Sequence, residues 1–423
     1  MLYSLVLAKK INMFKLRDYQ QDLSNKVASV IKENKIAILN AEVRTGKTHV
    51  ALDVASRYKN VLFITKKKAI SSIEDDYKTA NHSFNITIIN YESLHKIQGV
   101  FDLVICDESH NLATYPKPSK RIKAVKQFVT NDLLLLTGTL LPESNSQIFH
   151  QLWVSPHSPY KNCGNFYKWH KIYGTPAIVY TSYGEAKDYS VVDYDKIKGV
   201  VERLKVSFTQ KEAGFTTKVN EHIVKVDMKQ STVNLMNKLR KDLVIEGKEE
   251  TILADTGVKL MSKLQQMSSG TVKFESGNAK TLDTTKVDYI AERFKGKKLA
   301  IFYYYKQELE MIKDKFKDTL TTDLEEFNTT DKHIALQQIS GAEGINLSKA
   351  DVLIFINFGF SNTKYIQAKD RLTTMDRKVN DVYFIISNNG IDMNVYNALQ
   401  NKRDYVLQTF KRDERATISK ENQ

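Results

Sequence analysis

Short apolar runs alternate with longer stretches of helical periodicity along this chain, and the alternation occurs twice. Examples of the helical stretches are Gln20–Glu33 and His49–Tyr58. This alternation is typical of parallel β-sheets covered by helices. The apolar runs are Ile36–Asn40, Val61–Thr65, Ile86–Ile89, Leu103–Cys106 and Leu133–Thr137, followed by Leu299–Tyr304, His333–Ile339, Val352–Ile356 and Val382–Ile386.

The residue pattern changes between the two series of apolar runs. Residues 151–217 are rich in aromatic side chains and lack strand periodicity, so we expect an inserted, mainly helical element there. A chain of 423 residues has room for two or three domains. The sequence therefore predicts an α/β fold with two parallel-sheet domains in tandem. The predicted boundaries are 1–13 for an N-terminal tail, 14–150 for the first domain, 151–217 for the insertion, 218–405 for the second domain and 406–423 for a C-terminal tail.

A glycine-containing loop, Glu42–Thr48, lies between the first predicted strand and a predicted helix. This is the context of a phosphate-binding loop, in which backbone N–H groups and the helix N-terminus surround the phosphates. Lys47 would reach the β and γ oxygens of ATP, and the Thr48 hydroxyl would bind Mg²⁺. Ala41 stands where the first glycine of the pattern is usual, so a chance Gly-Lys-Thr is the alternative. The loop residues expected to contact the nucleotide are Arg44, Thr45, Gly46, Lys47 and Thr48.

Paired acids, Asp107 and Glu108, follow the apolar run Leu103–Cys106. Acids at the carboxyl end of a parallel strand point into the crevice where ligands of α/β proteins bind. There Asp107 can hold Mg²⁺, and Glu108 can polarise an attacking water. For either acid alone, capping of the following helix is the structural alternative. The combination with the preceding loop favours a nucleotide site.

Gln20 lies at the start of the first helical stretch, in the segment Leu16–Gln20. A glutamine amide both donates and accepts hydrogen bonds, so it can read two groups on the edge of an adenine at once. The alternative for this residue is an ordinary solvent-facing position on the helix.

The chain carries 63 Lys and Arg against 49 Asp and Glu, a net charge of +14. A basic surface gains affinity for nucleic acid by releasing counterions, so the excess favours a polyanionic partner. The cysteines Cys106 and Cys163 give no disulfide framework, and we expect a cytoplasmic protein in a reducing interior. No apolar stretch reaches the roughly 20 residues that cross a bilayer, so we expect no membrane partner.

Taken in order, these motifs resemble those of superfamily 2 helicases, and in particular the Swi/Snf-type DNA translocases, including small phage-encoded members. The resemblance implies two RecA-like domains that share one ATP with Mg²⁺ and couple its hydrolysis to domain closure. The matching segments are Leu16–Gln20 for adenine reading, Ala41–Thr48 for motif I, Val61–Ile70 for motif Ia, Asp107–His110 for motif II, Leu136–Thr139 for motif III, Leu264–Gly270 after the insertion, Ser340–Leu347 for motif V and Tyr365–Arg371 for motif VI.

Motif VI implies that an arginine of the second domain stabilises charge on the γ-phosphate held by the first. Arg371 occupies the first arginine position of this motif, whereas Thr374 occupies the second. Arg377 is therefore an alternative for the catalytic arginine, and both residues stay candidates. The resemblance also places Gly344 and Gln367 at the nucleotide. It gives a coupling role between nucleotide and DNA to His110, Thr137 and Thr139.

The resemblance places basic residues on a nucleic-acid track. Lys66, Lys67 and Lys68 follow the run Val61–Thr65, and lysines there suit phosphate contact without base reading. A solvated charged face is the alternative for each basic group. The cluster Phe302–Tyr305 can stack bases, but its position after an apolar run favours the core. Further expected nucleic-acid contacts are Lys117, Lys120, Arg121 and Asn346.

These observations predict an ATP-dependent translocase on duplex or branched DNA, which we expect to be a monomer or weakly associating. An RNA helicase or a strand-separating helicase on branched DNA is the nearest alternative. RNA fits less well, because Thr137-Gly138-Thr139 differs from the Ser-Ala-Thr of typical RNA helicases. A clamp that binds ATP and DNA without hydrolysis is an alternative of another class, which Thr374 keeps open.

Overall fold

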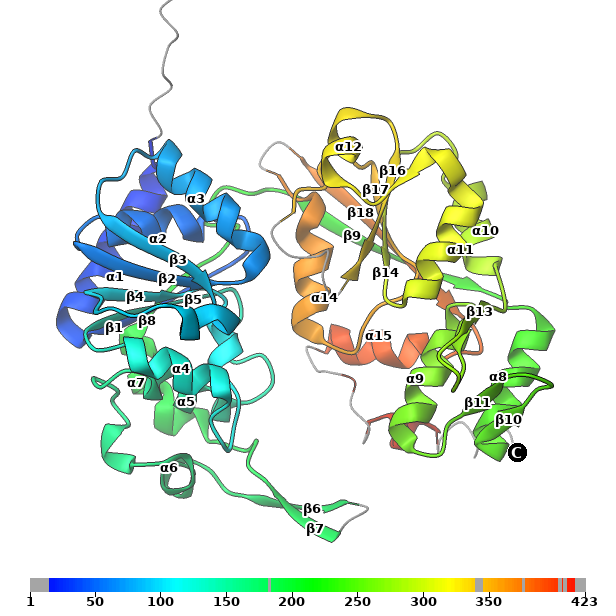
Figure 1. Ribbon diagram of the computed structural model, residues 1–423, viewed down its shortest axis with the longest axis horizontal. Coiled ribbons are helices and arrows are strands. Elements are labelled where there is room, and N and C mark those ends of the chain that lie inside the picture. The colour runs from blue at the N-terminus through cyan, green and yellow to red at the C-terminus, as the bar shows by residue number, and fades with distance from the viewer. Residues whose placement is uncertain are drawn as a thin grey trace, which may run out of the picture. The chain divides into compact units, whose positions relative to one another are not determined.

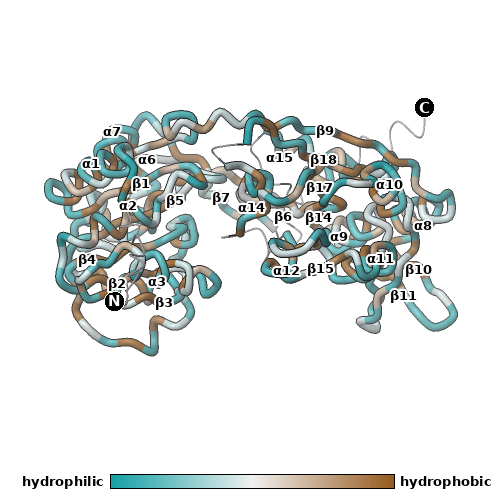
Figure 2. Tube along the Cα trace, turned by 90° about the horizontal axis from the view of Figure 1, so that it is seen from above, coloured by the Kyte–Doolittle hydropathy of each residue, from teal (hydrophilic) through white to brown (hydrophobic). Residues whose placement is uncertain are grey.

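The computed structural model describes residues 15–181, 184–338, 345–374, 377–401, 405 and 409–414. The chain divides into two compact units, Met1–Gly214 and Phe215–Gln423. Each unit is built on a six-stranded parallel sheet with helices packed against it (Figure 1). Hydrophobic segments alternate with hydrophilic ones along each unit (Figure 2). The predicted α/β class with two parallel-sheet domains is confirmed. In the described part of the chain, no helix is long and apolar enough to cross a bilayer.

The strands of the first unit are β1 (Ile36–Ala41), β2 (Asn60–Thr65), β3 (Asn85–Asn90), β4 (Leu103–Cys106), β5 (Asp132–Thr137) and β8 (Lys205–Phe208). They lie in the order β3-β2-β4-β5-β1-β8, and every neighbouring pair is parallel. The three strands β4, β5 and β1 are therefore adjacent, and the loops that follow them leave the same edge of the sheet.

Side chains alternate across this sheet, so each face has its own core. Ile36 and Ile38 of β1 belong to the core on one face, whereas Ala37 and Leu39 belong to the core on the other. The second face packs against α1 (Asp18–Asn34), α2 (Lys47–Ala55) and α3 (Ile70–Thr79). The first face packs against α4 (Lys120–Phe128), α5 (Ile148–Trp153), α6 (Phe166–Tyr173) and α7 (Tyr194–Leu204).

Residues 151–217 contain more strand than the sequence indicates. Helices α6 and α7 lie here as expected, but a hairpin of β6 (Ala177–Thr181) and β7 (Gly184–Asp188) lies between them. β8 then pairs with β1 at the edge of the first sheet. The prediction that this segment lacks strands is wrong, because β8 is only half-buried and therefore carries no apolar run. The predicted tail at 1–13, with 406–408 and 415–423 of the other tail, lies outside the described residues.

The strands of the second unit are β9 (Lys218–Val226), β14 (Leu299–Tyr303), β15 (Leu320–Thr321), β16 (His333–Gln337), β17 (Val352–Phe355) and β18 (Val379–Ser387). They lie in the order β15-β16-β14-β17-β18-β9, again all parallel. Every apolar run predicted as a strand forms one, although Ile339 lies outside the described residues. Phe302 and Tyr303 are buried in β14, which confirms the core interpretation of that aromatic cluster.

The helices of the second unit are α8 (Gln230–Asp242), α9 (Gly257–Ser268), α10 (Thr285–Arg293), α11 (Lys306–Phe316), α12 (Leu324–Thr329), α14 (Asn362–Lys369) and α15 (Asp392–Gln400). Two short hairpins accompany them, β10 (Val244–Glu246) with β11 (Thr251–Leu253) and β12 (Thr271–Lys273) with β13 (Ala279–Thr281). The sequence did not indicate these hairpins, since each of their strands has only three residues.

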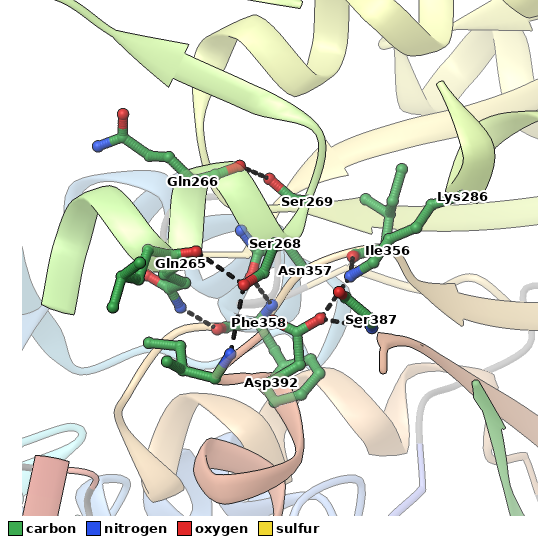
Figure 3. A network of polar contacts seen from close by, with 12 residues as sticks. Gln265, Gln266, Ser268, Ser269, Lys286, Ile356, Asn357, Phe358, Ser387 and Asp392 are labelled. Atoms are coloured by element: carbon green, nitrogen blue, oxygen red, sulfur yellow. Dashed lines mark hydrogen bonds and ion pairs between the residues drawn. The ribbon is translucent and has the colours of Figure 1, made fainter. Parts of the chain in front are cut away.

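A buried polar network fixes α9, α10 and α15 to the sheet of the second unit (Figure 3). Lys286 Nζ lies 2.6 Å from Asp392 Oδ2, and the two side chains are 1% and 3% exposed. The same Asp392 oxygen accepts a hydrogen bond from the Ser387 backbone N–H at 2.9 Å. From α9, Gln265 Nε2 donates to the carbonyl oxygen of Phe358 at 2.7 Å. The carboxylate of Asp392 therefore depends on Lys286 for its neutralisation.

Replacing Lys286 by methionine should destabilise the second unit by about 3–5 kcal/mol, because it leaves the charge of Asp392 buried and unpaired. Native-state hydrogen exchange of β14 and β18 amides measures this loss. Lys315→Met is the matched control, since Lys315 pairs with Asp288 where both side chains are more than 40% exposed, and should cost less than about 1 kcal/mol. Equal effects of the two substitutions would contradict the role of the buried pair.

Candidate functional site

The loop between β1 and α2 has the backbone of a phosphate-binding loop. Gly46 has φ 82°, and a Cβ atom added to it would lie 2.1 Å from Nε2 of Gln20. Only glycine fits such a position without strain. Lys47 folds back over the loop, because its Nζ donates to the carbonyl oxygens of Ala41 at 2.8 Å and Glu42 at 3.1 Å. The ammonium group therefore lies over the backbone that would hold the phosphates.

Two residues of α1 lie against this loop. Tyr19 donates its hydroxyl hydrogen to the carbonyl oxygen of Thr45 at 3.3 Å. Gln20 Oε1 accepts from the backbone N–H of Arg17 at 2.9 Å, and the Gln20 side chain is only 6% exposed. The solvent-facing alternative for Gln20 is therefore wrong. Thr45 is itself buried and donates through Oγ1 to the carbonyl oxygen of Glu42 at 2.8 Å.

Asp107 follows β4 and has its carboxylate fixed by two hydrogen bonds. Oδ2 accepts from Thr65 Oγ1 at 2.8 Å, and Oδ1 accepts from the backbone N–H of Glu108 at 3.0 Å. Burial raises the pKa of Asp107 to about 6 and the nearby charge of Glu108 adds to the rise, whereas Thr65 and Lys47 oppose it. A buried carboxylate of this kind gains from a neighbouring cation. We therefore expect Asp107 to be a metal ligand.

Glu108 leaves the line of the strand at once, with φ 49° in the left-handed region. Its Oε2 lies 3.3 Å from Nδ1 of His110, and the two side chains are 21% and 15% exposed. Glutamate and imidazole thus form a pair at the carboxyl edge of the sheet. Such a contact can set the orientation of the carboxylate.

Gln151 is a residue that the sequence analysis missed. It lies on α5, is fully buried, and accepts through Oε1 from Ser109 Oγ at 2.9 Å. Its Nε2 donates to the carbonyl oxygen of Leu140 at 2.9 Å. One amide therefore joins the loop after β4 to the loop after β5. The only sequence signal was a glutamine between the apolar residues Phe149 and Leu152.

The loop after β5 lies beside the phosphate loop, since a Cβ atom on Gly138 would lie 3.9 Å from Lys47 Nζ. Thr137 is buried, and its Oγ1 donates to the carbonyl oxygen of Thr139 at 2.9 Å. The same oxygen accepts from the backbone N–H of Thr139 at 3.0 Å. Hydroxyl bonding at the end of a strand accounts for these bonds, and the coupling role of the two threonines stays a prediction.

The basic residues of the first unit divide into two kinds. Lys67 and Lys68 are exposed and Lys66 is half-buried, directly after β2, and Lys117 and Lys120 are exposed before and at the start of α4. Arg121 is different, because its guanidinium lies 2.6 Å from Glu92 Oε1, 3.2 Å from Asn111 Oδ1 and 5.4 Å from the ring centre of Tyr91. These contacts favour a structural role for Arg121 over nucleic-acid binding.

The two candidate arginines of the second unit have different surroundings. Arg371 lies in a 3₁₀ turn after α14 and is 9% exposed. Arg377 donates to the carbonyl oxygens of Ser348 at 3.1 Å, Ala350 at 2.7 Å, Asp351 at 2.8 Å and Val379 at 3.1 Å. A guanidinium with four such acceptors is a structural cross-link. This arrangement favours Arg371 as the catalytic candidate.

The structure says less about three of the predicted site residues, Gly344, Gln367 and Asn346. Gly344 and the first residues of the motif V segment, 340–344, are outside the described residues. Gln367 lies in α14, but its side chain is outside the described part. Asn346 is exposed, and its Oδ1 accepts from the backbone N–H of Ser348 at 3.0 Å. Their roles stay predictions.

Comparison with known families supplies an independent finding. The family described as the SNF2-related domain matches residues 45–276, which is more than half of the chain. The chain belongs to the SNF2-related family. The resemblance to Swi/Snf-type proteins is thereby confirmed, and the phage-like character stays a prediction.

Two solved structures resemble this SNF2-related chain, both from Sulfolobus solfataricus. The SWI2/SNF2 ATPase core in complex with dsDNA is 14% identical, with 92% of this chain and 91% of that chain covered and a TM-score of 0.41. The SWI2/SNF2 ATPase core domain is 15% identical, with 92% and 89% covered and a TM-score of 0.41. A comparison with curated proteins finds no match.

Glu221 of β9 is a second residue that the sequence analysis missed. Its carboxylate accepts hydrogen bonds from Lys369 Nζ at 2.5 Å and Tyr365 at 2.8 Å, both on α14. Tyr396 and Gln400 of α15 donate to the same group at 2.8 Å and 2.5 Å. Burial by itself raises the pKa of Glu221, but the partners on both helices bring it below its usual value. In this SNF2-related chain, one carboxylate therefore anchors the helix that leads to the candidate arginine.

The residues of the first unit fit ATP with Mg²⁺. Mg²⁺ prefers oxygen ligands and usually takes one or two protein groups together with phosphate oxygens. Asp107 supplies a buried carboxylate and Thr48 supplies a hydroxyl at the start of α2. Among the described residues, no group of three or more His, Cys, Asp or Glu forms a cluster for a metal ion. That donor set fits Mg²⁺ shared with a nucleotide.

Asp107→Asn should stabilise the first unit near neutral pH. The folded-state pKa of Asp107 is raised from 3.8 to about 6, so its ionisation opposes folding above pH 6, and stability returns as the pH falls through 6 toward 4. The variant should exceed the wild type by up to about 3 kcal/mol at pH 7 and by much less at pH 4. Urea unfolding followed by tryptophan fluorescence measures it, since Trp153 and Trp169, the two tryptophans of the chain, both lie in this unit. If the difference in unfolding free energy between the variant and the wild type did not change with pH, the raised pKa of Asp107 would be contradicted.

Proposed function

We propose that this SNF2-related chain is an ATP-dependent DNA translocase, which couples ATP hydrolysis to movement along duplex or branched DNA. The observation that supports it most is the convergence of three loops at one edge of the first sheet. Lys47 lies over the loop after β1, Gly138 follows the neighbouring strand β5, and the buried carboxylate of Asp107 follows β4, the next strand along the sheet. This is the donor set that binding a nucleoside triphosphate requires.

The hydrolytic step assigns one task to each side chain. Lys47 exchanges the carbonyl oxygens of Ala41 and Glu42 for the β and γ phosphate oxygens. Asp107 and Thr48 would hold Mg²⁺, which would supply positive charge to the phosphates. Glu108, oriented by His110, takes a proton from the attacking water as the bond between the γ-phosphorus and the β–γ bridging oxygen breaks. The products are ADP and phosphate.

The second unit contributes Arg371, which we propose as the arginine that stabilises charge on the γ-phosphate. An arginine in this role is worth about 10³–10⁵ in rate in comparable enzymes. Glu221 acts as a positioning residue for it, because the same carboxylate holds Tyr365 and Lys369 of the helix that precedes Arg371. Dependence of the rate on an arginine from another domain links hydrolysis to domain closure.

DNA binding is proposed for the exposed lysines of the first unit, Lys67, Lys68, Lys117 and Lys120, together with Lys66. The net charge of +14 supports a polyanionic partner. Contacts of this kind neutralise phosphates and carry no sequence information. Arg121 is not part of this proposal, because its guanidinium is held by Glu92 and Asn111.

A clamp that binds ATP and DNA without hydrolysis is the second candidate. Thr374 stands where the family usually has its second motif VI arginine, and Arg377 is held by four carbonyl oxygens. Hydrolysis would then depend on Arg371 alone. Measurement of ATP turnover separates the motor from the clamp.

The test measures the ATPase rate of the wild type without nucleic acid and with single-stranded DNA, duplex DNA, forked DNA and RNA. We expect duplex or forked DNA to stimulate the rate most. Lys47→Ala and Glu108→Gln should each lower the stimulated rate by at least about 10²-fold. Glu108→Gln should still bind ATP, because the substitution keeps the shape of the side chain and removes only its basicity.

Lys205→Ala is a control for these variants, since Lys205 of the edge strand β8 forms an ion pair with Glu202 and has no task in the proposed hydrolytic step. It should leave the stimulated rate unchanged. No turnover with any nucleic acid would favour the clamp over the motor. Full turnover in Glu108→Gln would remove Glu108 from its proposed task.

A further inference from the structure

A cavity of about 770 Å³ lies in the second unit, at the amino-terminal edge of its sheet. Its walls come from the segments that lead into three neighbouring strands, β14, β17 and β18. The motifs for nucleotide binding and hydrolysis do not account for it. Its charged lining residues are Arg293, Lys295, Lys297, Lys349, Asp351, Arg377 and Asp381.

The cavity has an excess of positive charge that its own acids do not compensate. Lys295, Lys297 and Lys349 are exposed and form no ion pair with the described residues. Of the two acids, Asp351 accepts through Oδ2 from the backbone N–H of Lys298 at 2.7 Å. Asp381 is bound to His222 at 2.8 Å. Since like charges repel, an anion bound among these cations would lower their mutual repulsion.

Arg377 determines which groups face the cavity. Its guanidinium gathers the carbonyl oxygens of Ser348, Ala350 and Asp351 at 2.7–3.1 Å. Carbonyl oxygens repel anions, and here three of them accept hydrogen bonds from the guanidinium of Arg377. The segment that carries Lys349 is thereby held in one conformation. The cavity wall therefore presents the lysine rather than the backbone oxygens.

An aromatic stack supports the other side of the cavity. Phe294 packs edge-on against Tyr383 with ring centres 4.7 Å apart, and Tyr383 stacks on His222 at 4.3 Å. The guanidinium of Arg293 lies 5.9 Å from the centre of the Phe294 ring. Because Phe294 is only 6% exposed, this side is anchored in the core. The cations therefore lie on two segments, one held by the bonds of Arg377 and one by the packing of Phe294.

We propose that this cavity is a binding site for phosphate groups, with Lys295, Lys297 and Lys349 as the main ligands and Arg293 at its margin. Lysine ammonium groups bind phosphate as point charges, and several around one cavity suit a chain of phosphates. The ligand class is a polyphosphate, either a small molecule or the backbone of a nucleic acid. This site goes beyond the proposed motor function, since it requires no hydrolysis and uses none of the nucleotide-binding residues.

The test compares two triple variants of the full chain in a Lys47→Ala background, which removes the phosphate-binding lysine of the first unit. One is Lys295→Gln/Lys297→Gln/Lys349→Gln. The control, Lys238→Gln/Lys241→Gln/Lys248→Gln, removes the same charge from exposed lysines on and after α8 of the same unit. Binding of tripolyphosphate is measured by titration calorimetry, and binding of a labelled DNA duplex by fluorescence anisotropy at several salt concentrations. Thermal unfolding checks that both variants are folded.

We expect the cavity variant to bind at least about tenfold more weakly than the control in one of the two experiments, with a salt slope reduced by up to about 3 if DNA is the ligand. Loss of tripolyphosphate binding alone identifies a small polyphosphate, and loss of DNA binding identifies the nucleic-acid backbone. Equal binding by the two variants in both experiments overturns the proposal. A failure of the motor proposal is recognised separately, because it is seen in the ATPase rate and leaves these affinities unchanged.

Discussion

The adjacency of β4, β5 and β1 in the first sheet is the constraint on which the proposed site depends. Parallel strands end at the same edge, so the loops after these three strands meet there whatever their separation in sequence. The phosphate loop, the acids Asp107 and Glu108 and the turn at Gly138 are thereby brought together from separate segments. Gln151 then fixes two of these loops to each other through buried hydrogen bonds.

Bringing these loops together lowers the stability of the fold at two neighbouring residues. Asp107 is buried next to a second acid, so its pKa rises to about 6. Glu108 holds a left-handed backbone conformation, which is unfavourable for a side chain of its size. Both features oppose folding. The oxygens concerned are those proposed to bind a metal ion, for Asp107, and to accept a proton from water, for Glu108. Local strain of this kind is common where binding geometry matters more than stability.

The second unit differs in the way it secures its functional elements. Glu221 ties the helix that leads to Arg371 to β9, and Arg377 binds several carbonyl oxygens of the segment before β17. Each of these groups has several partners from elements far apart in sequence. Removing either would take away contacts to more than one element at once.

The sequence predicted the central strands well because they are buried on both faces and therefore read as continuous apolar runs. It missed the edge strands β8 and β9, which are half-exposed and mix lysines with apolar residues. Motif spacing predicted that the loop Glu42–Thr48 and the acid pair follow strands of one sheet, and both do. It did not reveal Gln151 or Glu221, whose importance comes from partners more than 30 residues away. For the same reason Arg121 and Arg377 looked available in the sequence but are engaged in the fold.

We propose that Arg371 of the second unit acts on the nucleotide bound by the first. The decisive measurement is single-turnover hydrolysis of ATP by Arg371→Ala, at saturating duplex DNA and with ATP affinity measured in parallel. We expect a rate lowered by about 10³-fold or more, with ATP affinity changed only severalfold. Hydrolysis at the wild-type rate in this variant would contradict it.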